Sequence, residues 1–146
     1  MRTDSRLSRM LHALIHMDQA DGPLTSETIA TMLGTNPVVV RRLLGGLRDF
    51  GYVQSEKGHG GGWALSVALD DITLLDVYRA VSEPPLFSDL VSEDAPECLV
   101  EQAVNAHLSA ALKDAEAALL ARFGEVTLGM LSHDFEAKAA RLRKPR

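Results

Sequence analysis

Two adjacent arginines, Arg41 and Arg42, are the side chains in this sequence best suited to bind a polyanion. A guanidinium group can donate paired hydrogen bonds to the acceptor edge of guanine, or it can bind a backbone phosphate. Because two neighbouring arginines more often lie on a solvated helix face, their position in the fold decides between these interpretations. They fall in a helix whose apolar stripe is expected at Val40, Leu43, Leu44 and Leu47. The outward face then carries Asn36, Pro37, Val38, Arg41, Arg42 and Gly45.

Other candidate contacts to DNA flank these arginines. Val38 can touch a thymine methyl group. Thr25 and Ser26 open the preceding helix, where free backbone N–H groups favour a phosphate. A glycine-rich loop, KGHGGG, lets the backbone approach a phosphate or the minor groove. Its candidate contacts are Lys57, His59 and Gly60. The loop has expected strands on both sides and lacks a Gly-Lys-Ser sequence, so a nucleotide site is disfavoured, and the alternative is a plain hairpin turn.

Residues able to hold a metal or to respond to oxidants are few and scattered. Cys98 is the single cysteine, which excludes an intrachain disulfide and makes it a candidate thiol sensor. Its acidic neighbours oppose thiolate formation, which favours a small, partly buried structural residue. His12 and His16 lie four residues apart, but two ligands do not make a metal site, and His133 has no evident partner. Since catalytic motifs are also lacking, we predict no metal, no cofactor and no enzyme activity.

Charge is distributed unevenly along the 146 residues. The net charge of −5 argues against binding nucleic acid or an anionic membrane by bulk charge alone. Residues 1–66 hold seven Lys/Arg and six Asp/Glu, whereas residues 67–146 hold eight and fourteen. Because no apolar segment is long enough to cross a bilayer and one free thiol suits a reducing compartment, we expect a cytoplasmic protein with no membrane partner.

Local patterns predict the helices that would present the arginines. A first helix is expected over 5–19, from apolar residues at helical spacing. A second helix begins at Thr25, a good cap, and ends at Gly34, which can adopt the left-handed conformation of a helix terminus. Asn36 caps a third helix and Pro37 suits its first position. Two helices joined by such a tight turn favour a helix-turn-helix.

A hairpin is expected to follow the third helix. Strand-like runs at 52–56 and 63–67 flank the glycine-rich tip. Together the elements form a winged helix-turn-helix domain over 1–82, in which the second helix of the motif enters a major groove. Gly45 and Gly46 lie inside that helix at a cost of about 1 kcal/mol each, and the sequence alone does not explain them.

A second unit is expected over 83–146, after a fourth helix at 73–82. A polar, proline-rich loop precedes a long helix at about 97–123, and a short helix at 127–135 precedes a basic tail. The long helix has an apolar stripe that needs burial, which makes it the candidate dimer interface. The stripe consists of Val104, Leu108, Leu112, Ala115 and Leu119. The fold class is therefore mainly α with a small β hairpin, and the loop could cover a pocket for a small-molecule effector.

One long segment resembles the Rrf2 family of bacterial winged-helix transcriptional regulators, which includes IscR, NsrR and CymR. The segment reads TNPVVVRRLLGGLRDFGYVQSEKGHGGGWALSVALDDITLLDVYRAV. The wing, GHGGGWAL, and the following DITLLDVYRAV are the most recognisable part, and the resemblance covers about residues 5–135. It implies a homodimer formed through the long helix, with the recognition helix and wing between Arg41 and His59. Members that bind an iron–sulfur cluster have three cysteines near the start of the long helix. This chain has only Cys98 in that region, which disfavours such a cluster. Within the family it is most similar to the cluster-free, YwnA-like branch.

We therefore predict a sequence-specific DNA-binding transcriptional regulator, a repressor that binds a near-palindromic operator as a homodimer. Residues 36–62 carry a balance of only +2, so binding should depend more on dimerisation and base contacts than on bulk charge. Two alternatives stay open. One is a winged-helix module that binds protein, which the acidic total supports. The other is a redox or metal sensor that acts through Cys98 or the histidines.

Overall fold

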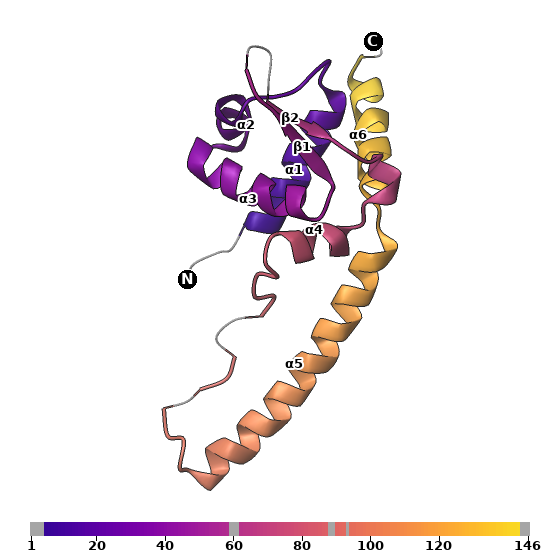
Figure 1. Cartoon of the computed structure of the whole chain (residues 1–146). Coiled ribbons are helices and arrows are strands. Elements are labelled where there is room, and N and C mark those ends of the chain that lie inside the picture. Colours follow the sequence, from indigo (N-terminus) through magenta and orange to yellow (C-terminus); the bar gives the residue numbers. More distant parts are fainter. Residues whose placement is uncertain (1–4, 59–61, 88–89, 93, 144–146) are drawn as a thin grey trace.

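The computed structural model describes residues 5–58, 62–87, 90–92 and 94–143. The chain forms a compact head, leaves it in an extended loop, and returns along one long helix (Figure 1). The elements in order are α1 (Arg6–Gln19), α2 (Ser26–Leu33), α3 (Pro37–Asp49), β1 (Val53–Glu56), β2 (Gly62–Leu65), the 3-10 helix η1 (Leu69–Asp71), α4 (Leu74–Ala80), α5 (Leu99–Glu125) and α6 (Leu128–Arg143). The predicted fold class is confirmed. Below, "the head" means α1–α4, the hairpin and α6, and "the arm" means α5 with the loop that leads to it.

One apolar core holds the head together. The stripe expected on the third helix is confirmed, because its four side chains are all at most 5% exposed. They are Val40, Leu43, Leu44 and Leu47. They pack with Met10 and Leu14 of α1 and Ile29 of α2, each at most 1% exposed. Burying one such side chain stabilises the fold by about 1.5–3 kcal/mol, so this core fixes how α3 stands on the head.

The predicted helix ends are confirmed by their hydrogen bonds. The Thr25 hydroxyl accepts from the Thr28 N–H at 3.1 Å, and the Asn36 side-chain oxygen accepts from the Val39 N–H at 3.1 Å. Gly34 has φ +65°, and its N–H bonds to carbonyls of the preceding turn. A residue with a side chain adopts this φ only at a cost, so Gly34 makes the turn between α2 and α3 possible.

The hairpin pairs β1 with β2 in antiparallel register, from Val53 opposite Leu65 to Glu56 opposite Gly62. The second strand ends two residues earlier than predicted. Trp63 also bridges to Leu24, with N–H to carbonyl distances of 2.7 and 3.0 Å in the two directions. This bridge ties the hairpin to the segment just before α2.

Close packing between α3 and α4 explains one of the two interior glycines. A Cβ at Gly46 would overlap the carbonyl oxygen of Ala80 in α4. A Cβ at Gly45 would meet only the end of the Arg48 side chain, at 3.9 Å. Only Gly46 is therefore required by backbone approach.

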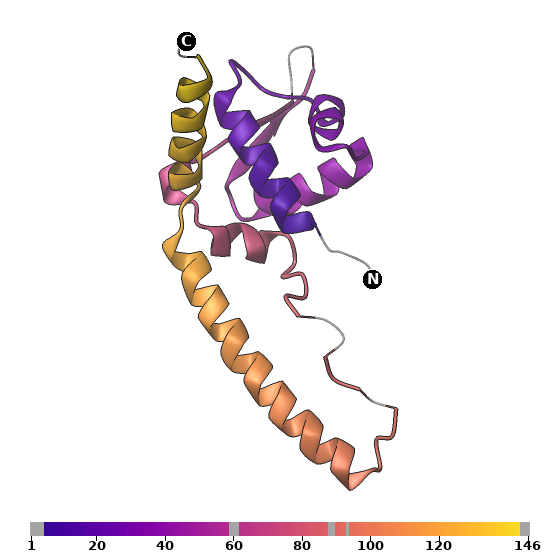
Figure 2. The ribbon, with the colours of Figure 1, turned by 180° about the vertical axis from the view of Figure 1, so that it is seen from behind.

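The last helix is longer than predicted: it has 16 residues, whereas the expected range 127–135 has nine. It runs to Arg143 instead of ending near Phe135, because the alanines and basic residues there are good helix formers. The first half of the expected basic tail is therefore helical, and residues 144–146 lie outside the described part. The helix α6 lies beside α1 and η1 on the head, where Leu128 is fully buried (Figure 2).

The arm joins the head at α4. Tyr78 is buried, its hydroxyl donates to the Pro84 carbonyl at 3.0 Å, and its ring meets Phe123 of α5 edge to face. Burial and the negative charges of Glu116 and Glu83 raise the pKa of Tyr78. Beyond this joint, α5 has no buried residue. None of the helices in the described residues is long and apolar enough to cross a membrane.

Candidate DNA interface

The outward face of α3 lies at one edge of the head, next to α2 (Figure 1). Asn36, Arg41 and Arg42 are exposed, Val38 is 65% exposed, and Pro37 is half-buried. Arg42 has no ion pair within the described residues. The predicted protruding face therefore exists in the fold, with apolar, amide and guanidinium groups side by side.

Arg41 is paired with Glu27, which the sequence analysis did not single out. One guanidinium nitrogen lies 3.4 Å from the carboxylate, and both side chains are more than half exposed. Such a surface pair contributes at most about 1 kcal/mol, so Arg41 can exchange this partner for another anion. Glu27 thus holds Arg41 between α2 and α3 without burying it.

The two residues predicted at the start of α2 differ in what they can offer a phosphate. Thr25 is exposed, and its hydroxyl is already engaged as the helix cap. Ser26 is only 7% exposed, and its oxygen accepts a hydrogen bond from the Trp63 indole N–H at 2.9 Å. The Ser26 side chain is therefore a structural contact, and only backbone N–H groups at this helix start are left for an anion.

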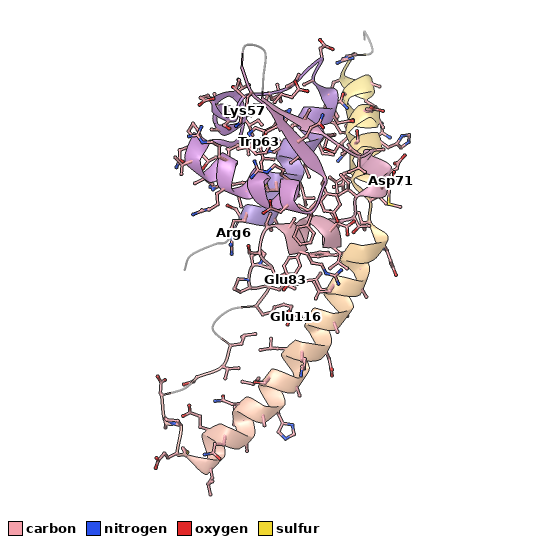
Figure 3. The ribbon with its side chains drawn as sticks, in the orientation of Figure 1. Arg6, Lys57, Trp63, Asp71, Glu83 and Glu116 are labelled. Atoms are coloured by element: carbon pink, nitrogen blue, oxygen red, sulfur yellow. The ribbon has the colours of Figure 1, made fainter. Side chains whose placement is uncertain are left out.

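Of the DNA contacts predicted in the wing, Lys57 lies within the described residues, and it is exposed directly after β1 (Figure 3). Gly58 follows with φ +95°, a conformation that glycine adopts without strain. The other two predicted wing contacts, His59 and Gly60, lie outside the described residues.

Trp63 is the residue that joins these parts, and the sequence analysis did not identify it. Its backbone bridges to Leu24, its indole bonds to Ser26, and the Arg48 guanidinium carbon lies 5.8 Å from the ring centroid. The ring thereby links the wing to both helices of the motif. A lone Trp beside a glycine-rich turn was the available signal in the sequence.

The predicted stripe of the long helix is only partly covered by this chain. Val104 is 50% and Leu108 is 38% exposed, Leu112 and Leu119 are half-buried, and Ala115 is exposed. Apolar side chains on an isolated helix face gain stability only when another surface covers them. The geometry leaves this face open for a partner.

A hollow of about 660 Å³ lies between the loop after α4 and α5. Apolar side chains of the loop face it, as do Lys113 and Glu116. This is where the sequence analysis expected a pocket for an effector, and the mixed charges of its wall select no class of ligand.

The sensor candidates do not come together. Cys98 is exposed directly before α5, so the expectation that it is partly buried is wrong. His12 and His16 hydrogen-bond to each other, with their Nε2 atoms 3.0 Å apart, and His133 is exposed on α6. Within the described ranges, no three His, Cys, Asp or Glu side chains are grouped as metal ligands.

Comparisons with known proteins agree with this geometry. The model of the Rrf2 family, described as an iron-dependent transcriptional regulator, matches residues 3–134. YwnA of Bacillus subtilis (strain 168), described as an HTH-type transcriptional regulator, is 33% identical over 118 residues, which are 80% of this chain and 86% of that protein. A transcriptional regulator from Lactobacillus plantarum has a TM-score of 0.75 and 24% identity, over 95% of both chains. A structure described as a DNA-binding protein has a TM-score of 0.67 and 30% identity, over 86% of this chain and 97% of that one.

Iron, which the family description names, does not fit the residues present. Iron–sulfur clusters are held mainly by several cysteine thiolates, and the sequence has one cysteine. That cysteine is exposed, and the described residues group no other ligands near it. Iron therefore has no part in the mechanism derived from this chain.

Proposed function

Because the chain belongs to the Rrf2 family of transcriptional regulators, we propose that it binds a near-palindromic operator as a homodimer and represses transcription. Members of this family are regulators and not enzymes. The observation that carries the proposal is the exposed face of α3, where Val38, Arg41 and Arg42 project from a helix whose opposite face is fully packed. Since its partner is chromosomal DNA, we place the protein in the cytoplasm.

The contacts follow from the chemistry of these groups. In a major groove, Arg42 donates to a guanine edge and Val38 covers a thymine methyl group. Arg41 exchanges its ion pair with Glu27 for a contact to a base or a phosphate. The Glu27 carboxylate then repels phosphates, which disfavours positions of the protein along the DNA that bring a phosphate next to Glu27. Lys57 of the wing and the N–H groups at the start of α2 bind flanking phosphates, which fix the orientation of the head.

The dimer supplies the second half of the site. The open stripe of α5 packs on the same stripe of a second copy, which places two heads at the ends of a symmetric pair. Two α3 helices then contact half-sites about one helical turn or more apart. Residues 36–62 of each head carry a balance of only +2, so two heads are needed for tight binding.

The test is operator retention by the double variant Arg41→Ala/Arg42→Ala, with the operator selected from bound genomic fragments. We expect at least about a thirtyfold loss, because two base contacts are each worth about 1–3 kcal/mol. The control is Arg79→Ala/Arg141→Ala, which removes the same charge from exposed positions on α4 and α6. Equal retention by the two double variants contradicts the assignment of α3.

Salt separates DNA binding from the protein-binding alternative. The logarithm of the binding constant should fall with the logarithm of salt concentration by roughly 0.9 per phosphate contacted. A flat salt response, or no retention of any genomic fragment, favours a winged-helix module that binds protein. A half-site that binds as tightly as the full site contradicts the dimeric arrangement.

A further inference from the structure

A groove of about 650 Å³ is lined by side chains of α1 and α6. The helix α6 lies on the side of α1 away from α3 (Figure 2). Its apolar wall has side chains from both helices: Leu11, Ile15, Leu131 and Phe135. Sites for small organic molecules are commonly 300–1,000 Å³ and apolar, with a few polar groups that fix the orientation of the ligand. The groove has this size and this kind of wall.

The polar part of the wall offers hydrogen-bond donors. It consists of His12, His16, Gln19 and Arg143. The two imidazoles already share a hydrogen bond of 3.0 Å between their Nε2 atoms, so one ring donates and the other accepts. Arg143 adds a guanidinium group that is always charged and can bind a carboxylate with two parallel bonds.

The absence of acidic residues from the wall distinguishes this groove from three other hollows in the described part of the chain. The hollow between η1 and α6 has Asp18, Asp70 and Glu136, and the two beside α5 have Glu116 and Glu101. The chain carries 20 Asp and Glu against 15 Lys and Arg. In so acidic a protein, an apolar groove walled by Arg and His and no carboxylate is complementary to an anion.

We propose that the α1–α6 groove binds an apolar monocarboxylate, with its chain against the apolar wall and its carboxylate at Arg143 and the histidine pair. A metal ion fits less well, because His12 and His16 supply two ligands and Arg143 places a fixed positive charge in the same wall. The proposal concerns a site apart from the DNA interface and does not depend on DNA binding.

Binding there would connect two parts of the molecule. The opposite face of α1 is core: Met10, Ala13, Leu14 and Met17 are all at most 7% exposed. The other wall, α6, follows directly from the arm. A bound carboxylate would therefore hold α6 against the head, and bound ligand would stabilise the folded chain by mass action.

The test uses the full chain, with decanoate as the probe and decan-1-ol as its uncharged counterpart. We expect saturable decanoate-induced shifts of backbone amide NMR signals in residues 11–19 and 131–143. We also expect binding at least tenfold tighter than that of the alcohol. His12→Gln/His16→Gln and Arg143→Gln should each weaken decanoate binding at least tenfold, because all three side chains are outside the core. His133→Gln, an exposed histidine on α6 outside this groove, should leave it unchanged.

Four results would overturn the proposal. The first is no saturable shift with millimolar decanoate. The second is equal binding of the alcohol, which would make the groove merely apolar. The third is an equal effect of His133→Gln and of the groove variants. The fourth is a Zn²⁺ titration that shifts the same signals and saturates where decanoate does not, which would assign the pair to a metal. Circular dichroism of each variant establishes that it is folded.

Discussion

The head and the arm differ in what covers their apolar side chains. In the head, the stripe of α3 is buried by α1, α2, the hairpin and α4 of the same chain, and Leu44 is fully buried. In the arm, α5 spans 27 residues without one buried side chain, and Leu108 is 38% exposed. Burial within one chain therefore explains the head, whereas the arm has a stripe but no partner. The head therefore buries its own apolar side chains, whereas the arm needs a partner to do so.

The largest expected effect is in the head. Leu44→Ala removes a fully buried side chain and should lower the free energy of unfolding by about 2–5 kcal/mol. Chemical denaturation monitored by circular dichroism measures the loss, which should not depend on protein concentration. A loss below about 1 kcal/mol would break the comparison, because the head core would then not be the source of stability.

A smaller effect distinguishes the two glycines of α3. Gly46→Ala forces α3 away from Ala80 and should cost about 1–3 kcal/mol of unfolding free energy. Gly45→Ala meets only the flexible end of Arg48 and should stabilise the helix by up to about 1 kcal/mol. The same denaturation experiment measures both, and equal effects would contradict the close approach of α3 to α4.

In the arm, the expected change is in association. Leu108→Ala should weaken the dimer about tenfold, or about 1.4 kcal/mol, because the stripe is covered only by a partner. Sedimentation over a range of concentrations measures this change. Leu99→Ala is the matched control, since Leu99 is 78% exposed and five residues before Val104, on the other side of the helix. Equal weakening in both variants would contradict the stripe as the interface.

The smallest effect is at the joint between head and arm. The pKa of Tyr78 is raised above its ordinary 10.0, first by burial and then by Glu116 and Glu83. The neutral phenol therefore stabilises the fold fully below about pH 10, and this contribution is lost as pH rises through the raised pKa. In alkaline denaturation, Tyr78→Phe should remove this part of the pH dependence. An unchanged slope in that variant would show that the joint does not titrate.

Much of the head could be predicted from local sequence. Thr25, Gly34 and Asn36 act within a few residues of their own position, so capping chemistry was sufficient to place the helix ends. The end of α6 was missed because nothing in the sequence stops the helix after Phe135, and an alanine-rich, charged segment looks the same in a helix and in a tail. The role of Gly46 depends on Ala80, 34 residues away, which local patterns do not connect.

In the candidate site, too, local patterns were predictable from the sequence and contacts between distant residues were not. Periodicity placed Arg41 and Arg42 on the outward face, but it could not show that Glu27 pairs with Arg41. Backbone N–H groups at the start of α2 were expected to favour a phosphate, but local patterns could not show that the Ser26 side chain bonds to Trp63 of the hairpin. The roles of Thr25, Val38 and Lys57 at DNA and of the α5 stripe in a dimer stay predictions.

Trp63 gives the molecule a built-in optical reporter. It is the single tryptophan of the chain, and its indole N–H bonds to the first residue of α2 while Arg48 of α3 lies over its ring. Light emitted by this ring therefore originates where the wing meets both helices of the motif. If bound nucleic acid displaces the wing, α2 or α3, the wavelength or the yield of the tryptophan fluorescence should change, without an attached dye.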